Sequence, residues 1–507
     1  MYLSNCSLPF KDKSFCKFLG ILIVYAFIFT GIAIWRYENF LIHGSNDLLL
    51  FEQFIYNTLH GRPFYATGIE NGFAYHNSPI LFILVPFAVI IPVPYVLYAS
   101  TVLSIAVSAI PIYLISREEL KSEKLAMLLG ACYIMLPGIV GQVYQSFHEI
   151  NLALPFLTFS FYYFIKERFY PFLIMFVLGL MVKEDVPATF FMFSIYALIK
   201  KRDMKWYIFP AVISITWLLL SLNIIIPFFS KNHSYSMIYY FSDLGNSFSE
   251  IFTNVASNPM HIFYKLFIPL PDKLSYLYVL FLPVGLVLPF ISIEILFAIP
   301  SLFLNLLAES SRFRLVDCYT PYGTIPIPRH MSLIAIVFLF ISSLYSLKKI
   351  GLLFPKRAIQ IRLILSLSLA IGVVYSDRFI VLGEGLYSLP SHVASRESIE
   401  LILSYIPINA TVKADRWIAT HLYNRKEVYT SESLTDTDYI IVAESLFAYK
   451  ATRDKNEFLS NDNDVKTGDL LVFDRNGKPV NIGIREKYDL VALEKGIALF
   501  KKRGIGK

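Results

Sequence analysis

The stretch SPILFILVPFAVIIPVP, residues 78–94, decides how many times the chain crosses a membrane. It is apolar enough to enter a bilayer, but it is short and contains Pro79, Pro86, Pro92 and Pro94. A proline inside a helix removes a backbone hydrogen bond and clashes with the preceding turn. A spanning helix also needs about 20 mostly apolar residues. We therefore expect this block to lie on the outer face of the membrane, or to dip into it, without crossing.

The rest of the first three quarters of the chain consists of similar apolar blocks. Hydrophobic residues make up 56% of the sequence and charged residues 16%, whereas soluble domains carry about 25% charged residues. The composition predicts a mainly α, polytopic bundle of about eleven membrane-spanning helices. The blocks lie near residues 18–36, 96–115, 124–141, 151–165, 170–182, 186–199, 206–228, 276–290, 291–307, 327–347 and 360–382.

The distribution of Lys and Arg orients these blocks. If residues 78–94 do not cross, the short loops on the side of the N-terminus hold seventeen Lys and Arg, and the longer loops on the other side hold nine. Cytoplasmic loops are enriched in these residues, so we expect a cytoplasmic N-terminus in the cell membrane and an extracytoplasmic C-terminal domain. Because these loop clusters account for the net charge of +7, nucleic acid is not an expected partner.

The predicted boundary between the membrane domain, residues 1–382, and a small soluble α/β domain, residues 383–507, follows the change in composition. Within the first domain, residues 37–95 form a long outer segment that we expect to fold into short surface helices. In the second domain, SIELILSYI has helical apolar spacing and RDKNEFLSNDNDVKTGD is polar enough for a loop or surface helix. The predicted strands are EVYTSE, YIIVAES, LLVFDR and GIALFKK.

Two acids and a histidine in the outer segment are candidates for chemistry. Asp47 and Glu52 follow the first span, and partial burial would raise the basicity of either carboxylate enough for a general base. Their alternative role is that of solvated loop acids, or of a helix N-cap before the apolar run LLLFEQFIY. His76 is suited to bind a phosphate or a metal, or to make structural hydrogen bonds.

Further polar residues lie where later spans meet the outer face. His148 and Glu149 occupy a short turn, where they either line the mouth of the bundle or cap the turn. Lys183, Glu184 and Asp185 form a KED motif between two apolar stretches. Charges there must be hydrated, paired, or directed into a polar cavity. A simple hairpin turn at the membrane surface is the alternative.

Arg329 and His330 open the tenth span in the segment YTPYGTIPIPRH. Arginine binds phosphate with two parallel hydrogen bonds, so this pair is a candidate for a lipid phosphate. The alternative is that the side chains snorkel to the membrane interface.

The order of four motifs resembles a family of predicted multi-spanning membrane proteins of archaea and bacteria, catalogued as a domain of unknown function. The motifs are DLLLFEQFIYNTLHGRPFY, HNSPI, YQSFHEINLALPF and MVKEDVPA. The C-terminal pieces ATHLYNRKEVY, DYIIVAES and YDLVALEKGIALFKKR are also similar, so the resemblance covers nearly the whole chain.

That family in turn resembles the C-type superfamily of membrane glycosyltransferases, which take a sugar from a polyprenyl-phosphate carrier. The resemblance implies membrane lipid, a polyprenyl-phosphate sugar donor and an unknown acceptor as partners. It implies Asp47 as the catalytic base, since Asp47 fits the acidic position after the first span. His76 fits the stretch before the second. The substrate-binding candidates are Glu52, His76, His148, Glu149, Lys183, Glu184, Asp185, Arg329 and His330.

Two positions depart from the superfamily pattern. Asp47 and Glu52 are five residues apart where several relatives have adjacent acids, and CYTPYG stands where relatives often have a His-Tyr pair. No cofactor is assigned, and a divalent metal ion is left open. The competing functions are a lipid or solute transporter, including a flippase, and a non-catalytic membrane anchor or sensor.

Overall fold

The computed structural model describes residues 12–504, apart from several internal gaps, and divides the chain into two compact units. The first unit comprises residues up to 33, 71–86 and 95–388; the second comprises 34–70, 87–94 and 389 onward. Each unit is described by itself. The gaps are residues 42–45, 70, 232, 234, 309–315, 321–322, 380–395, 431–432, 434, 444–470, 474–478, 482–486 and 495–496.

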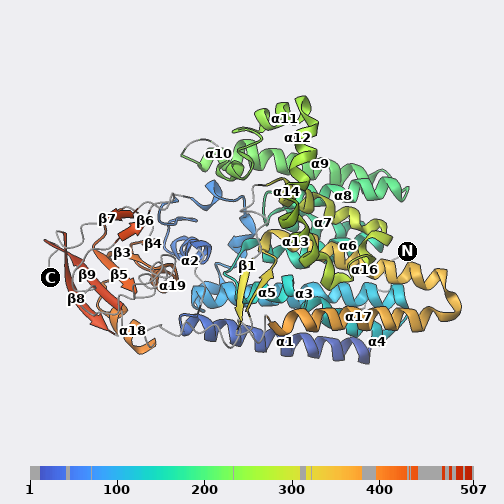
Figure 1. The fold of residues 1–507 in the computed structure, drawn as a ribbon, viewed down its shortest axis with the longest axis horizontal. Helices are drawn as coiled ribbons and strands as arrows, with labels where there is room; N and C mark the ends of the chain where they lie inside the picture. The colour runs from blue at the N-terminus through green and yellow to red at the C-terminus, as the bar shows by residue number, and fades with distance from the viewer. Residues whose placement is uncertain are drawn as a thin grey trace. The chain divides into compact units, whose positions relative to one another are not determined.

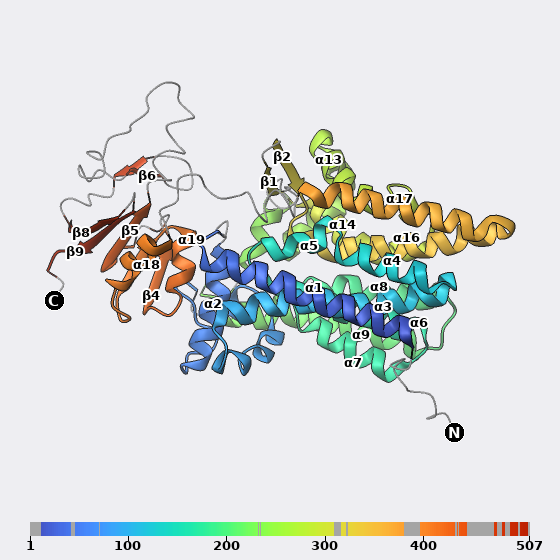
Figure 2. The same ribbon diagram turned by 90° about the horizontal axis from the view of Figure 1, so that it is seen from below.

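The first unit is a bundle of apolar helices. Helices that are hydrophobic all round are buried or face lipid, and both environments occur here. The long helices run alongside one another in Figures 1 and 2. The main helices are α1 (Lys13–Glu38), α3 (Val93–Leu120), α4 (Glu123–Ile134), α5 (Pro137–Tyr144), α6 (Ala153–Ile165), α7 (Phe169–Leu180), α8 (Val186–Ile199), α9 (Lys205–Leu220), α13 (Leu270–Phe281), α14 (Ile299–Leu307), α16 (Leu333–Leu353) and α17 (Ala358–Phe379).

Four helices among the described residues are long and apolar enough to cross a membrane, or six if two bent pairs each form one span. Four shorter apolar helices accompany them: 149–165, 169–180, 186–199 and 293–307. The chain is thus a polytopic helical protein with a small C-terminal sheet, as expected. The number of eleven spans stays a prediction.

The proline-rich block that orients the topology forms two short 3-10 helices, η2 (Pro79–Ile83) and η3 (Phe87–Val89), before α3 begins at Val93. The block is thus two short helical turns rather than one continuous helix. Neither short helix is long enough to cross a bilayer. The backbone of this block is instead tied to its neighbours, since Ile80 N–H donates to the carbonyl of Met181.

The blocks near 276–290 and 291–307 are also not two continuous helices. Three 3-10 helices, η7 (Leu282–Val284), η8 (Leu288–Ile291) and η9 (Ile293–Ala298), separate α13 from α14. Irregular backbone at membrane depth needs internal hydrogen-bond partners. Helix α16 supplies them, because the hydroxyls of Ser342, Ser343 and Ser346 donate to carbonyls of this segment.

The remaining parts of the first unit are short elements. The second predicted outer segment, which follows the apolar block near 206–228, contains η6 (Ser236–Phe241), α11 (Phe248–Ser257) and α12 (Pro259–Phe267), and α10 (Ile226–Phe229) leads into it. The third forms an antiparallel hairpin of β1 (Val316–Thr320) and β2 (Gly323–Ile327), followed by η10 (His330–Ser332). This hairpin was not predicted from an alternating apolar pattern in the sequence.

The second unit is built on a five-stranded sheet in the order β4-β3-β5-β9-β8. Strand β3 is parallel to β4 and β5, whereas β9 is antiparallel to β5 and β8. The four predicted strands and the predicted helix are confirmed. Strands β3, β7 and β8 were missed, and residues 453–469 lie outside the described residues. The elements are α18 (Arg396–Ser404), β3 (Thr411–Ala414), α19 (Arg416–Ala419), β4 (Glu427–Thr430), β5 (Tyr439–Ala443), β6 (Leu471–Phe473), β7 (Pro479–Asn481), β8 (Tyr488–Glu494) and β9 (Ile497–Lys502).

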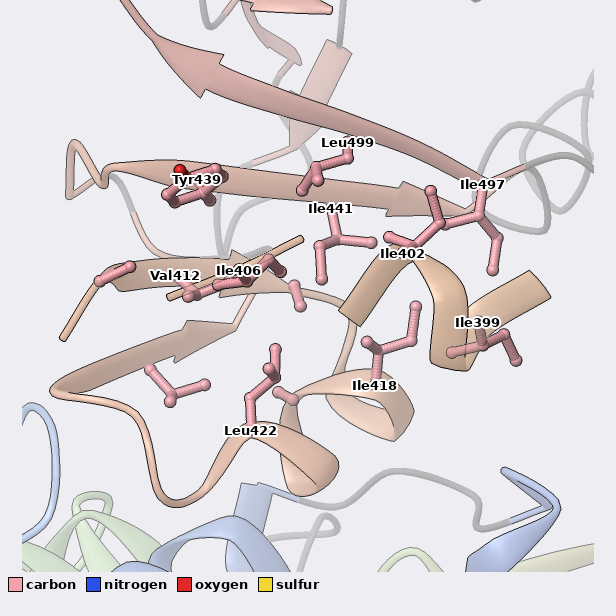
Figure 3. Packing of buried hydrophobic residues seen from close by; sticks show 14 of the residues in the cluster. Ile399, Ile402, Ile406, Val412, Ile418, Leu422, Tyr439, Ile441, Ile497 and Leu499 are labelled. Atoms are coloured by element: carbon pink, nitrogen blue, oxygen red, sulfur yellow. The ribbon is translucent and has the colours of Figure 1, made fainter. Parts of the chain in front are cut away.

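The core of this unit lies between the sheet and helices α18 and α19 (Figure 3). Two residues of the first outer segment, Phe40 and Leu49, belong to the same buried cluster. Leu49 comes from α2 (Asn46–Leu59), and the backbone N–H of Val428 donates to Thr67 of the same segment. The outer segment and the C-terminal domain therefore share one hydrophobic core.

Candidate functional site

The KED motif occupies the tight junction between α7, which ends at Leu180, and α8, which begins at Val186. Asp185 stands at the N-cap position of α8, and Pro187 follows in the first turn, where its missing N–H costs nothing. Lys183 and Glu184 are buried and Asp185 is half-buried. The motif is therefore more enclosed than a simple surface turn would be.

Glu184 joins three outer segments of the first unit. One carboxylate oxygen, Oε1, accepts hydrogen bonds from His76 Nδ1 at 2.7 Å and from the Tyr235 hydroxyl at 2.8 Å. The other, Oε2, accepts the backbone N–H of Asn77 at 3.2 Å. Hydrogen bonds to ionised groups are stronger than neutral ones. Glu184 thus holds the HNSP stretch, the KED junction and the second outer segment together.

The stretch before the second span is also fixed from its other side. Asn77 Nδ2 donates to the hydroxyl of Ser221 at 2.7 Å. Ser221 opens a five-residue π-helical segment, η5 (Ser221–Ile225), that continues α9. Such π-bulges occur frequently at functional sites. His76 is therefore restrained both by its own bond to Glu184 and by the anchored Asn77 that follows it.

An ion pair between Lys183 and Glu149 connects the KED motif to the turn that contains His148 and Glu149. Lys183 Nζ lies 2.5 Å from Glu149 Oε1, and His76 Nε2 lies 3.9 Å from the same oxygen. Glu149 begins the 3-10 helix η4 (Glu149–Leu152) and is 1% exposed. This ion pair connects the junction between α7 and α8 to the turn that contains His148.

The charges of this cluster stabilise one another. Burial raises the pKa of Glu184, but His76 and then Lys183 outweigh burial and lower that pKa to about 2. Burial likewise raises the pKa of Glu149, yet Lys183 and His76 hold it below its usual value. Burial lowers the pKa of Lys183, and Glu149 more than reverses this effect, so that the pKa lies above its usual value. Both carboxylates and the lysine are charged at neutral pH.

Two further histidines extend the cluster. The rings of His148 and His330 stack, with centroids 3.4 Å apart and planes 22° apart, and Ser146 Oγ lies 3.3 Å from His148 Nε2. Gln145 donates to the carbonyl of Pro328, which holds the segment of Arg329 and His330 against the His148 turn. Lys183 and His76 are within electrostatic range of His330. Eight of the ten predicted site residues thus gather in the first unit.

The other two candidates, Asp47 and Glu52, lie in α2 of the second unit. Asp47 is half-buried in the first turn, where a negative charge is favoured by the helix dipole. Glu52 is 0% exposed, and neither of its carboxylate oxygens makes a hydrogen bond of good geometry with a described residue. Burial raises its pKa well above the usual value, and the nearby Tyr37 hydroxyl only weakens this rise.

A metal site is not evident in the described part of the chain. No group of three or more His, Cys, Asp or Glu side chains there is arranged to hold a metal ion. In the cluster, the carboxylates accept from lysine and histidine donors, His148 contacts the hydroxyl of Ser146, and the rings of His148 and His330 stack. The residues present provide hydrogen-bond donors for an anion more readily than ligands for a metal.

Sequence reasoning found the charged members of the cluster because charges at span junctions are rare. It missed the polar residues that hold them in place: Asn77, Ser221 and Tyr235. Asn77 had a signal, since it follows His76 directly. Tyr235 and Ser221 had none, because both contacts join segments more than fifty residues apart in sequence.

The comparisons with known proteins agree with this architecture. A family model described as predicted membrane protein (DUF2079) matches residues 36–471. A solved structure of ArnT from Cupriavidus metallidurans bound to undecaprenyl phosphate aligns with a TM-score of 0.52 at 10% identity, covering 93% of this chain and 97% of that one. The apo structure of the same protein aligns with a TM-score of 0.49 at 9% identity, covering 96% and 98%. No curated protein matches by sequence. The chain therefore has a C-type glycosyltransferase-like fold.

Proposed function

The chain belongs to the DUF2079 family of predicted membrane proteins, and we propose that it is a membrane glycosyltransferase. In this proposal it moves a sugar from a polyprenyl-phosphate carrier to an acceptor at the outer face of the membrane. The N-terminus is cytoplasmic and the C-terminal domain is extracytoplasmic, as the distribution of Lys and Arg favours. The likeness to ArnT supports the fold. Binding of a polyprenyl-phosphate carrier by this chain is part of the proposal.

The observation that carries the proposal is the cluster of donors at the junctions between the first unit's helices. Lys183, His76 and the segment of Arg329 and His330 come from three different junctions and meet around Glu149 and His148. Positioned cations stabilise the negative charge that develops on a leaving phosphate. The junctions also lie next to apolar helices, where a polyprenyl chain can remain in the bilayer while its phosphate reaches the cluster.

The chemistry requires one base and one site for the leaving group. The oxygen of an acceptor hydroxyl forms a bond to the anomeric carbon of the sugar. The bond between that carbon and the phosphate oxygen breaks, and polyprenyl phosphate leaves with the electron pair. The hydroxyl proton passes to a base, which typically accelerates such a step by about 10²- to 10⁴-fold.

We assign the base to Asp47. Glu52, on the same helix, is 0% exposed, so an acceptor hydroxyl cannot reach it, and burial raises its pKa. Asp47 is half-buried in the first turn of α2 and follows the first span. It is therefore the accessible acid of the two.

The test is a transfer assay on the purified full chain with mixed polyprenyl-phosphate sugars and a cell-envelope extract as the source of acceptor. Release of polyprenyl phosphate is measured. We expect Asp47→Asn to lose at least 100-fold in rate with unchanged folding. Asp243→Asn is the matched control, because Asp243 pairs with Lys265 outside the cluster and should keep its rate.

Full activity of the Asp47→Asn variant would refute the assignment of the base. Absence of release by the wild-type chain with every donor would refute the proposed function.

A further inference from the structure

Glu149 occupies an unusual place within the cluster. A single oxygen, Oε1, faces both Lys183 Nζ at 2.5 Å and His76 Nε2 at 3.9 Å. The side chains of Lys183 and His76 are 10% and 11% exposed, whereas that of Glu149 is 1% exposed. The side chains of Lys183 and His76 thus keep some exposed surface, whereas the carboxylate is almost completely enclosed.

His76 is held in its position by a contact that does not involve Glu149. Glu184 accepts from Nδ1 of His76, so Nε2 is the ring nitrogen left facing Glu149. Lys183 is adjacent to Glu184 in the junction between α7 and α8. An ammonium group has three donors, and the Glu149 carboxylate is the partner that the structure shows for it. Lys183 can thus bind an external anion beside Glu149.

The carboxylate and an incoming phosphate compete for the same positive charge. A buried lysine without a counter-charge is strongly unfavourable, and removal of one partner of such a pair costs about 3–5 kcal/mol. Glu149 removes this penalty in the empty protein. Its negative charge also repels a second anion at the same place. A phosphate therefore gains less from binding Lys183, whose charge Glu149 already balances, and it is also repelled by the Glu149 carboxylate.

We infer that Glu149 is a built-in competitor that weakens the binding of a phosphate ester to Lys183 and His76. The inference rests on the proposed function and adds the regulation of carrier affinity to it. Transfer converts a phosphodiester with one negative charge into a phosphomonoester with up to two, so the spent carrier would bind more tightly than the donor. A resident carboxylate opposes this tighter binding and favours release of the product.

Equilibrium binding of farnesyl phosphate to the purified full chain in detergent tests the inference. Farnesol measures binding through the hydrocarbon chain alone, and inorganic phosphate measures binding without the chain. We expect Glu149→Gln to bind farnesyl phosphate about tenfold more tightly than wild type. We expect Lys183→Gln to bind at least tenfold more weakly. Glu118→Gln is the matched control, because it breaks a lysine pair of the same 2.5 Å length elsewhere in the unit and should not change the affinity.

The outcomes separate this inference from the proposed function. Unchanged or weaker binding by Glu149→Gln, together with loss of binding by Lys183→Gln, would overturn the competitor role and leave the phosphate site intact. Equal binding of farnesyl phosphate and farnesol by wild type and by both variants would refute the proposed function as well. If Glu149→Gln does not fold, Glu149→Asp withdraws the carboxylate from Lys183 and must also tighten binding; weaker or unchanged binding there would equally overturn the inference.

Discussion

Two buried glutamates, one in each unit, show opposite behaviour. Glu184 in the first unit and Glu52 in the second are 2% and 0% exposed. Yet the pKa of Glu184 is lowered to about 2, and that of Glu52 is raised well above its usual value. Glu184 accepts hydrogen bonds from His76, Asn77 and Tyr235, whereas burial dominates at Glu52. Burial alone therefore does not determine the charge of a carboxyl group; the supply of donors does.

The difference separates the roles of the two regions. The first unit gathers charged side chains from several junctions and keeps them ionised at low exposure. The second unit encloses an acid whose pKa burial raises and whose carboxylate oxygens have no hydrogen-bond partner among the described residues. An ionised and partly accessible cluster can bind a charged substrate, whereas an enclosed acid without such partners is not placed to do so.

Of the two glutamates, Glu184 should show the larger loss of stability when it is replaced by glutamine. Glu184→Gln keeps the shape but removes the charge that His76 and Lys183 face, and loss of one partner of a buried pair costs about 3–5 kcal/mol. We expect a marked fall in the midpoint of thermal unfolding at pH 7, with loss of transfer.

The pH dependence provides the control for Glu184. Its folded-state pKa lies below the unfolded value of 4.5, so its stabilisation is present above that value and is lost as the pH falls towards 2. The destabilisation caused by Glu184→Gln should shrink on acidification below pH 4.5. A variant as stable as wild type at pH 7 would contradict this account of the charge network.

Glu52→Gln should have a smaller effect of opposite sign. The folded-state pKa of Glu52 is raised above the unfolded value of 4.5, so the wild type loses stability as the pH rises through the interval between them. Each unit of that rise corresponds to about 1.4 kcal/mol. We expect Glu52→Gln to match wild type near pH 4 and to be more stable at pH 7. Thermal unfolding across this pH range measures the effect, and a variant less stable than wild type at pH 7 would show that Glu52 is ionised and paired.

Sequence reasoning identified the charged half of the cluster for a physical reason. Ionisable residues beside apolar spans are costly unless paired, so Lys183, Glu184 and the His148 turn were conspicuous. Their pairing was not predictable, because the contacts of Glu149 with Lys183 and of His76 with Glu184 join distant segments. The fold class followed from composition, and the superfamily followed from motif order.

The shared core of the second unit could not be predicted from the sequence, for a different reason. Phe40 and Leu49 lie about 350 residues before Ile399 and Ile402, with which they cluster. From the sequence alone, an apolar residue beside a membrane span is equally consistent with a lipid-facing position and with a position in a protein core.

Mass spectrometry of lipid retained by the purified chain tests the central claim most directly. We predict that wild type carries a polyprenyl phosphate or a polyprenyl-phosphate sugar, and that Lys183→Gln, folded and purified in the same way, loses most of it. Absence of any phosphorylated polyprenyl lipid from wild type, or equal amounts in both proteins, would contradict the claim that the junction cluster binds the phosphate of a lipid-linked sugar.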